Sequence, residues 1–201
     1  MFENTIANIL ENIWPMLVIF LVIICSLRIA YVIKNKIKFV FYREILALGF
    51  IIYIMCLFYV VTFQDVSWST SNFIPFKEML RYRLFSRLFF KNVVGNMIMF
   101  MPYGFFVSYI LKPEKKKTIF YLCLLISCTI EVTQMAIGRV FDIDDIMLNI
   151  IGGMIGYYIY KIIYIIRDKL PKFLKNQVFY NIIVSVILIL IFTYIYKILG
   201  V

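Results

Sequence analysis

Residues 131–156 read EVTQMAIGRVFDIDDIMLNIIGGMIG. The stretch consists of two apolar runs joined by a short loop with three aspartates; Glu131 lies inside the first run, and an asparagine and three glycines lie inside the second. A charged side chain at the centre of a membrane-spanning helix costs about 2.5–3.5 kcal/mol on insertion scales, so its presence there indicates a site. We therefore take this stretch as the centre of the fold and of the candidate function.

The composition around this stretch indicates an integral membrane protein. The chain has 201 residues, of which 64% are hydrophobic, and a formal net charge of +10. The Lys and Arg residues stand between apolar runs, as expected for cytoplasmic loops and for contact with anionic lipid headgroups. No nucleic-acid motif accompanies the charge, so we expect membrane lipids and no nucleic acid as partners.

The chain contains no histidine. Ser-His and Cys-His triads and the common zinc sites are therefore excluded. If the protein is an enzyme, which we do not favour, its chemistry depends on carboxylates or a metal without histidine. The four cysteines all fall in apolar segments without metal spacing and are interpreted as packing residues.

The apolar runs predict an all-α integral membrane protein with about six transmembrane helices and one amphipathic interfacial helix. The spans are expected at 13–33, 45–63, 92–111, 118–137, 146–166 and 178–199. A polar link occupies 64–77, and the interfacial helix is expected at 77–91, where apolar residues recur at helical spacing among basic ones. We divide the chain into an N-terminal two-helix hairpin with its link (1–71), a central domain (72–165) and a basic loop with a last helix (166–201).

The basic links predict the orientation in the membrane. Those after the first, third and fifth spans each carry four Lys or Arg residues, whereas the loop 139–145 carries only Arg139. The positive-inside bias then places both termini and the loop 139–145 outside the cytoplasm. The segment 64–91 fits this orientation least well, because its 77–91 part would carry five basic residues to the outside.

Helical spacing brings the polar residues of this region together. In the fifth span Asp145, Asn149, Gly152 and Gly156 share one face, and the two glycines allow another helix to approach closely. Pro102 and Gly104 in the third span predict a bend or a close approach there. The candidate polar cluster, which we place between the third, fourth and fifth spans, contains Asn92, Asn96, Glu131, Gln134, Arg139, Asp142, Asp144, Asp145 and Asn149.

Simpler interpretations exist for these residues. Aspartates before a helix are common caps, and amides between helices often serve only to join them. As a ligand of the cluster, a divalent cation held by Asp142, Asp144, Asp145 and Glu131 is chemically reasonable, since such ions prefer oxygen ligands, although the spacing matches no known metal motif. A cationic substrate is the alternative.

An ordered set of residues resembles the VanZ-like family. It runs from Asn92-Val-Val-Gly95-Asn96 and Pro102-x-Gly104, through Glu131-x-x-Gln134, to Arg139-x-x-Asp142-x-Asp144-Asp145-x-x-x-Asn149-x-x-Gly152, with Asn72-Phe-Ile-Pro75-Phe upstream. The resemblance covers about residues 72–165. It implies a small bacterial membrane protein, typical of Gram-positive cells, and a link to low-level resistance to teicoplanin, a glycopeptide with an acyl tail.

Four functions follow as hypotheses. The leading one is a membrane factor at the outer leaflet that binds an amphiphile, either a lipid-linked cell-wall precursor or a lipoglycopeptide, and contributes to glycopeptide resistance or envelope homeostasis. The second is a metal-assisted enzyme acting on a polyprenyl phosphate or another lipid. The third is a small transporter or flippase, which with six spans would need to form a homo-oligomer. The fourth is a structural partner that uses the glycine face.

Overall fold

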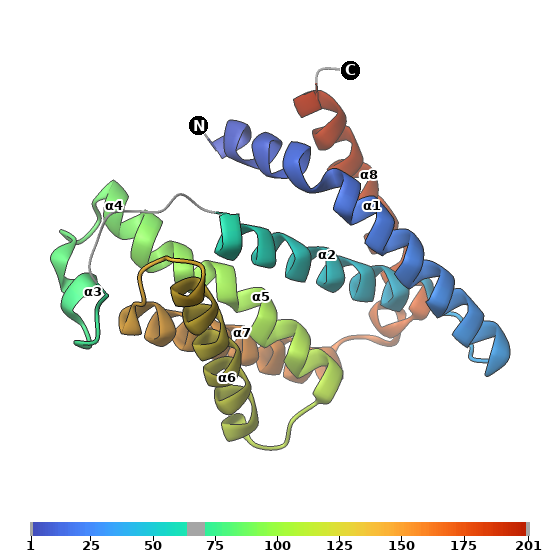
Figure 1. Cartoon of the computed structure of the whole chain (residues 1–201). Coiled ribbons are helices and arrows are strands. Elements are labelled where there is room, and N and C mark those ends of the chain that lie inside the picture. Colours follow the sequence, from blue (N-terminus) through green and yellow to red (C-terminus); the bar gives the residue numbers. More distant parts are fainter. Residues whose placement is uncertain (1, 64–70, 200–201) are drawn as a thin grey trace. The chain divides into compact units, whose positions relative to one another are not determined.

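The structure is a computed structural model that describes residues 2–63 and 71–199. Within these residues the chain is helical apart from short links, and the β-structure is limited to one isolated bridge. Six helices are long and apolar enough to cross a membrane (Figure 1). The expected all-α membrane bundle of about six spans is thus confirmed. The chain ends and residues 64–70 of the expected polar link lie outside the described residues.

The long helices agree with the expected spans to within a few residues, except that the first begins earlier. The elements are α1 (Phe2–Lys34), α2 (Phe41–Phe63), α3 (Lys77–Arg81), α4 (Arg87–Phe89), the π-helix η1 (Phe90–Val94), α5 (Gly95–Leu111), α6 (Lys116–Ala136), α7 (Ile143–Lys169), the 3-10 helix η2 (Lys172–Lys175) and α8 (Gln177–Leu199). The agreement follows from length, because about 20 apolar residues are needed to cross the hydrocarbon core.

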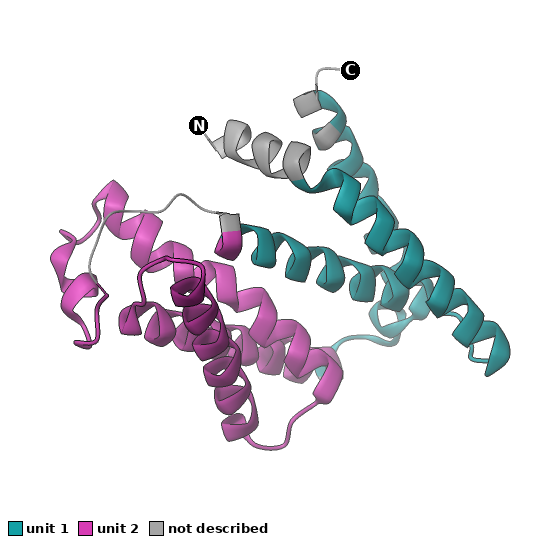
Figure 2. Cartoon of the chain, in the orientation of Figure 1, with its two compact units in different colours: residues 1–60, 169–201 teal, residues 61–168 magenta. Residues whose placement is uncertain are grey.

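The chain divides into two compact units (Figure 2). Unit 1 comprises residues 1–60 and 169–201, and unit 2 comprises residues 61–168. In unit 1, Arg28 of α1 donates two hydrogen bonds of 2.9 Å to the carboxylate of Glu44 in α2. The Tyr42 N–H donates to Asn181 Oδ1 of α8 at 3.1 Å, which joins the start of α2 to the last helix.

In unit 2, α5 and α7 approach each other at backbone distance. A Cβ atom added to Gly152 would overlap the Met97 carbonyl oxygen, and one added to Gly156 would overlap that of Met101. A Cβ on Gly104 would in turn overlap the carbonyl oxygen of Gly153. The expected close contact at Gly104, Gly152 and Gly156 is therefore present. It is made with α5 of the same chain, so this glycine face is already covered and offers no contact for a partner protein. α5 itself continues through Pro102 to Leu111.

The segment 77–91 differs from the single interfacial helix expected there. It forms the short helices α3 and α4, separated by residues 82–86, before η1 begins. Tyr82 is extended, and Phe85 has a φ of 62°, which is incompatible with a continuing α-helix. The Ser86 side chain then caps α4 by accepting a hydrogen bond from the Phe89 N–H at 3.1 Å. The apolar spacing correctly predicted helical structure, but the extended Tyr82 and the positive φ of Phe85 end the first helix, and the cap at Ser86 begins a second one.

Candidate functional site

The acidic loop before α7 is paired with the segment that follows residue 70. The Asn72 N–H donates to the Phe141 carbonyl at 2.8 Å, and the Ile143 N–H donates to the Asn72 carbonyl at 3.0 Å. These two bonds form the isolated bridge between Asn72 and Asp142. The Asn72 side chain adds a 2.9 Å hydrogen bond from Nδ2 to Asp142 Oδ1. Asn72 is buried, so it fixes the loop rather than facing solvent.

Asp144 holds the beginning of α3. Its Oδ2 accepts hydrogen bonds from the backbone N–H groups of Glu78 at 2.8 Å and Met79 at 3.1 Å, and its Oδ1 accepts one from the Phe76 N–H at 2.5 Å. The first N–H groups of a helix have no partner inside it, and a carboxylate is well suited to accept from them. Asp144 is only 1% exposed. It therefore acts as a cap supplied from another helix, whereas the simpler interpretation expected the aspartates to cap the helix that they precede.

Asp145, the next residue, points to α5. Its Oδ1 accepts a hydrogen bond from Asn96 Nδ2 at 2.5 Å. Asn96 and Asp145 thus connect the first turns of α5 and α7 at the same end of unit 2. The predicted proximity of the third and fifth spans at these two residues is present.

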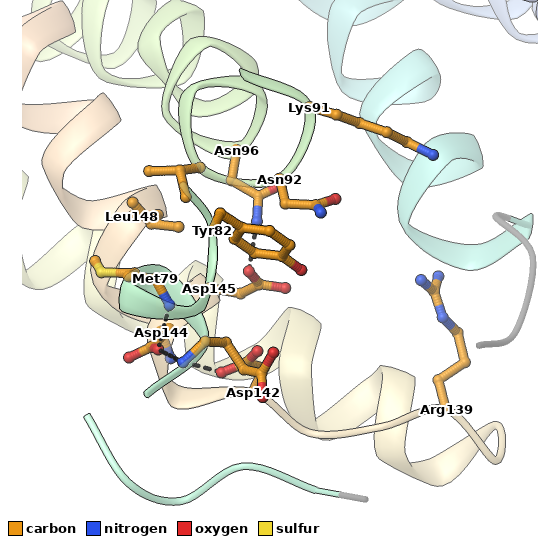
Figure 3. A pocket seen from close by; sticks show the side chains of 12 residues that line it. Met79, Tyr82, Lys91, Asn92, Asn96, Arg139, Asp142, Asp144, Asp145 and Leu148 are labelled. Atoms are coloured by element: carbon orange, nitrogen blue, oxygen red, sulfur yellow. Dashed lines mark hydrogen bonds between the residues drawn. The ribbon is translucent and has the colours of Figure 1, made fainter. Parts of the chain in front are cut away.

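A cavity of about 430 Å³ lies at this end of unit 2 (Figure 3). Its lining combines acids, bases, amides and a phenol: Glu78, Met79, Tyr82, Lys91, Asn92, Val93, Asn96, Arg139, Asp142, Asp144, Asp145 and Leu148. Six of these belong to the predicted cluster, and the other residues come mainly from the segment 78–93. In Figure 3 the side chains of Lys91 and Arg139 extend away from the aspartates.

The polar groups that line the cavity fall into two classes. Asp142, Asp144 and Asp145 are each bound to other parts of the protein through the hydrogen bonds given above. In contrast, the structure gives the side chains of Tyr82, Lys91 and Asn92 no hydrogen bond or ion pair with another described residue, although all three residues line the cavity. The acids therefore build the walls, and the phenol, ammonium and amide groups remain available to a ligand.

Three predicted members of the cluster bind neighbouring groups of the protein: Glu131 and Gln134, which do not line the cavity, and Arg139, which does. Glu131, 2% exposed, accepts a 2.9 Å hydrogen bond from the Asp142 N–H at Oε2. Gln134 donates to the Val61 carbonyl at 3.2 Å, and the Arg139 guanidinium donates to the same oxygen. Glu131 and Arg139 thus do not form an ion pair with each other.

Asn149 turns toward α6 and away from the cavity. Its Nδ2 donates to Ser127 Oγ at 2.9 Å, and its Oδ1 is buried without a hydrogen-bond partner among the described residues. Four residues of α-helix advance by about 400°, so Asn149 is rotated about 40° from Asp145 around α7. That rotation is enough to direct the two side chains to different helices.

The residues that were expected to bind a metal ion form hydrogen bonds within the protein instead. Within residues 2–63 and 71–199, no group of three or more Cys, Asp or Glu side chains is placed so that it could hold a metal ion. The carboxylates of Asp142 and Asp144 accept backbone and amide hydrogen bonds, and Glu131 supports the loop backbone. A divalent cation at Asp142, Asp144, Asp145 and Glu131 therefore gains no support from their arrangement.

Burial raises the pKa of Asp142 above its ordinary value of 3.8, while the hydrogen bond from Asn72 acts in the opposite direction. We expect Asn72→Ala to raise this pKa further, which the carboxyl ¹³C shift of labelled protein would measure. A pKa that is higher in the folded state means that folding favours the protonated form of Asp142. Its contribution to stability is therefore fully present below pH 3.8 and is lost as the pH rises through the raised pKa. Asn72→Ala should shift the end of that loss to higher pH; an unchanged titration would contradict the proposed hydrogen bond.

Sequence reasoning missed several residues of this site. Asn72 appeared in the family pattern without a role, and Ser127 was not considered, although it precedes Glu131 by four residues and thus shares its helical face. Tyr82 and Lys91 carried no signal of their own, because their place in the cavity depends on the break in the segment 77–91. The spacing of Ser127 from Glu131 could have indicated that both residues point to the same side of α6. The break in the segment 77–91 could not have been predicted from the spacing of its apolar residues.

Comparison with known proteins identifies the family of the chain. A sequence model described as VanZ/LLP1 matches residues 50–164, more than half of the chain, and so includes α5, α6, the acidic loop and most of α7. Protein VanZ of Enterococcus faecium is 33% identical over 73 residues, which are 35% of this chain and 45% of that protein. The chain thus matches less than half of the length of this relative. No solved structure matches. From the family match over residues 50–164, this chain belongs to the VanZ/LLP1 family.

Proposed function

We propose that this membrane protein binds the polar head of an amphiphile in the cavity of unit 2 and thereby contributes to glycopeptide resistance or envelope homeostasis. The observation that carries the proposal is the division among the lining residues. Tyr82, Lys91 and Asn92 line the cavity, and their side chains have no partner among the described residues, while the aspartates are held in place by the fold. Binding sites commonly combine a shaped cavity with a few such available polar groups.

The chemistry of these groups suggests the class of head. A Lys ammonium suits a phosphate or carboxylate, and amide and phenol groups suit the hydroxyl and amide groups of sugars. A volume of about 430 Å³ lies within the ordinary range of small-molecule sites. The lipid-linked cell-wall precursors, which carry phosphates and sugars on a lipid chain, have this combination. A lipoglycopeptide offers sugars and an acyl chain and is the other member of the same chemical class.

Charge supports a placement of the cavity at the outer leaflet. α5 and α7 begin at the cavity and α6 ends beside it, so their other ends lie at the opposite side of unit 2. That side carries Lys112, Lys115, Lys116 and Lys117 in the short link between α5 and α6, and Arg167 near the end of α7. The positive-inside bias favours the cytoplasm for such a link. The resemblance to the VanZ-like family, which implies a link to low-level resistance to teicoplanin, fits a role at the envelope.

The first test is direct binding. Wild-type protein in detergent micelles would be mixed with a short-chain prenyl pyrophosphate that carries the wall disaccharide-peptide, or with teicoplanin, and the complex would be quantified by native mass spectrometry. We expect Asn92→Ala to weaken binding about tenfold, since one lost hydrogen bond to a charged or polar head corresponds to about 1.4 kcal/mol. Because Asn92 has no described protein partner, thermal stability should stay unchanged.

A charge-matched pair sharpens this test. Lys91→Gln removes a basic group that lines the cavity, and Lys116→Gln removes one from the opposite end of unit 2. Binding should fall only in the first variant. Equal binding by wild type, Asn92→Ala and Lys91→Gln, or no binding of either probe by wild type, would refute the proposal. Teicoplanin susceptibility of a Gram-positive host with matched expression of the same variants then decides between resistance and a general envelope role.

A further inference from the structure

The segment from Lys77 to Lys91 exposes large apolar side chains that no part of the described chain covers. Leu80 and Phe85 are each 81% exposed and Leu84 is 69% exposed, which is unusual for neighbouring residues of a protein in water. Their exposure is built into the fold, because Asp144 fixes the start of α3 and Ser86 caps α4. The segment is thus held in place with its apolar residues outward.

Basic residues alternate with these apolar ones. The segment 77–91 has five basic side chains, Lys77, Arg81, Arg83, Arg87 and Lys91, and one acid, Glu78. Glu78 forms an exposed ion pair with Arg81 at 3.1 Å, and the structure gives Arg83 and Arg87 no acidic partner among the described residues. Apolar and basic groups side by side are the combination that binds the boundary between lipid tails and anionic headgroups.

The position of the segment along the chain places it at that boundary. The candidate span Arg87–Leu111 begins in α4 and continues through η1 and α5, so residues 77–86 directly precede the start of a membrane crossing. Exposed Leu80, Leu84 and Phe85 would then meet the outer part of the acyl chains, and the arginines would meet the phosphates. An acidic protein partner would match the charge but would leave the apolar side chains without acyl chains to contact.

We propose that the residues of the segment 77–91 that do not line the cavity form a docking surface for anionic phospholipids, distinct from the site that binds the polar head. They are Leu80, Leu84, Phe85, Arg81, Arg83 and Arg87. Arg81, Arg83 and Arg87 do not line the cavity, so their role can be tested without changing it. Lys91 is left out of the test because it lines the cavity.

The test uses the full chain with a single fluorescent reporter. Trp14→Phe and Trp68→Phe remove both native tryptophans, and Leu84→Trp places one in the segment. The protein is reconstituted into phosphatidylcholine vesicles that contain increasing fractions of brominated phosphatidylglycerol or brominated phosphatidylcholine. We expect the anionic lipid to quench the reporter at a several-fold lower fraction than the zwitterionic lipid.

Neutralising the segment should abolish this preference. Arg81→Gln, Arg83→Gln and Arg87→Gln together should bring the ratio between the two lipids to about one while brominated phosphatidylcholine still quenches, which shows that the segment remains at the interface. The matched control, Lys115→Gln, Lys116→Gln and Lys117→Gln, removes the same charge elsewhere and should keep the preference. The proposal is overturned by the absence of quenching with both lipids, by equal quenching in the unneutralised protein, or by an equal loss in the control.

Discussion

Replacing Asp144 with asparagine is expected to release the start of α3 from α7. The carboxylate accepts three backbone hydrogen bonds, from Phe76, Glu78 and Met79, in a site that is 1% exposed. The amide of asparagine retains one accepting oxygen and turns a donor toward N–H groups that are themselves donors. Loss of charged hydrogen bonds with buried donors left unpaired costs about 3 kcal/mol. Hydrogen exchange of the peptide 72–81 should therefore accelerate about a hundredfold.

A charge-matched control separates this effect from a change in net charge. Glu114→Gln also removes one negative charge, from an exposed position in the link between α5 and α6, and should leave the exchange of the peptide 72–81 unchanged. Peptides of α5 should exchange alike in both variants. If the peptide 72–81 exchanged as slowly in Asp144→Asn as in the wild type, the three hydrogen bonds of Asp144 would not be what holds the start of α3.

The second large effect is expected at the contact between α5 and α7. Gly152→Ala places a methyl group where the Met97 carbonyl oxygen lies, so the two helices must separate or bend. Overpacking typically costs about 1–3 kcal/mol, and we expect about 3 kcal/mol here because a backbone atom must move. This cost exceeds the gain of about 1 kcal/mol from replacing glycine by alanine in a helix. We expect a net loss of about 2 kcal/mol in the free energy of unfolding, measured by SDS titration in mixed micelles.

The matched variant is Gly49→Ala in α2. A Cβ atom at Gly49 has nothing within 4 Å, so this substitution changes helix propensity without a steric cost and should leave stability equal or higher. The comparison isolates the close helix contact because both variants add the same methyl group to a helix interior. Equal stability of the two variants would mean that α5 and α7 are not in backbone contact at Gly152.

The part of the fold that depends on length and spacing could be read from the sequence. The fourth span was expected at 118–137 and is Lys116–Ala136, because membrane thickness sets the length of an apolar helix. The close contact at Gly152 and Gly156 followed from small residues at helical spacing. Spacing along one helix also placed Asp145 near the third span, where Asn96 meets it.

The part that depends on contacts between distant segments could not be read in this way. Asn149 shares a side of α7 with Asp145, but a small rotation around the helix directs it to Ser127 of α6. The segment 77–91 has the apolar spacing of one helix, yet a φ of 62° at Phe85 and the cap at Ser86 divide it. Such pairings decide which polar groups at the cavity keep no partner among the described residues. Of these groups, Asn92 belonged to the predicted cluster, whereas Tyr82 and Lys91 did not.

The long separation between Asp144 and the segment that it caps has a consequence for biosynthesis. The Glu78 N–H and its acceptor are 66 residues apart in the sequence. At about 5–20 residues per second, the ribosome adds Asp144 roughly 3–13 s after Glu78. During this interval the start of α3 lacks its cap, and two further apolar helices, α5 and α6, are synthesised. The wall of the cavity formed by the segment 78–93 is therefore completed only when α7 begins to emerge, which makes the cavity a late product of translation.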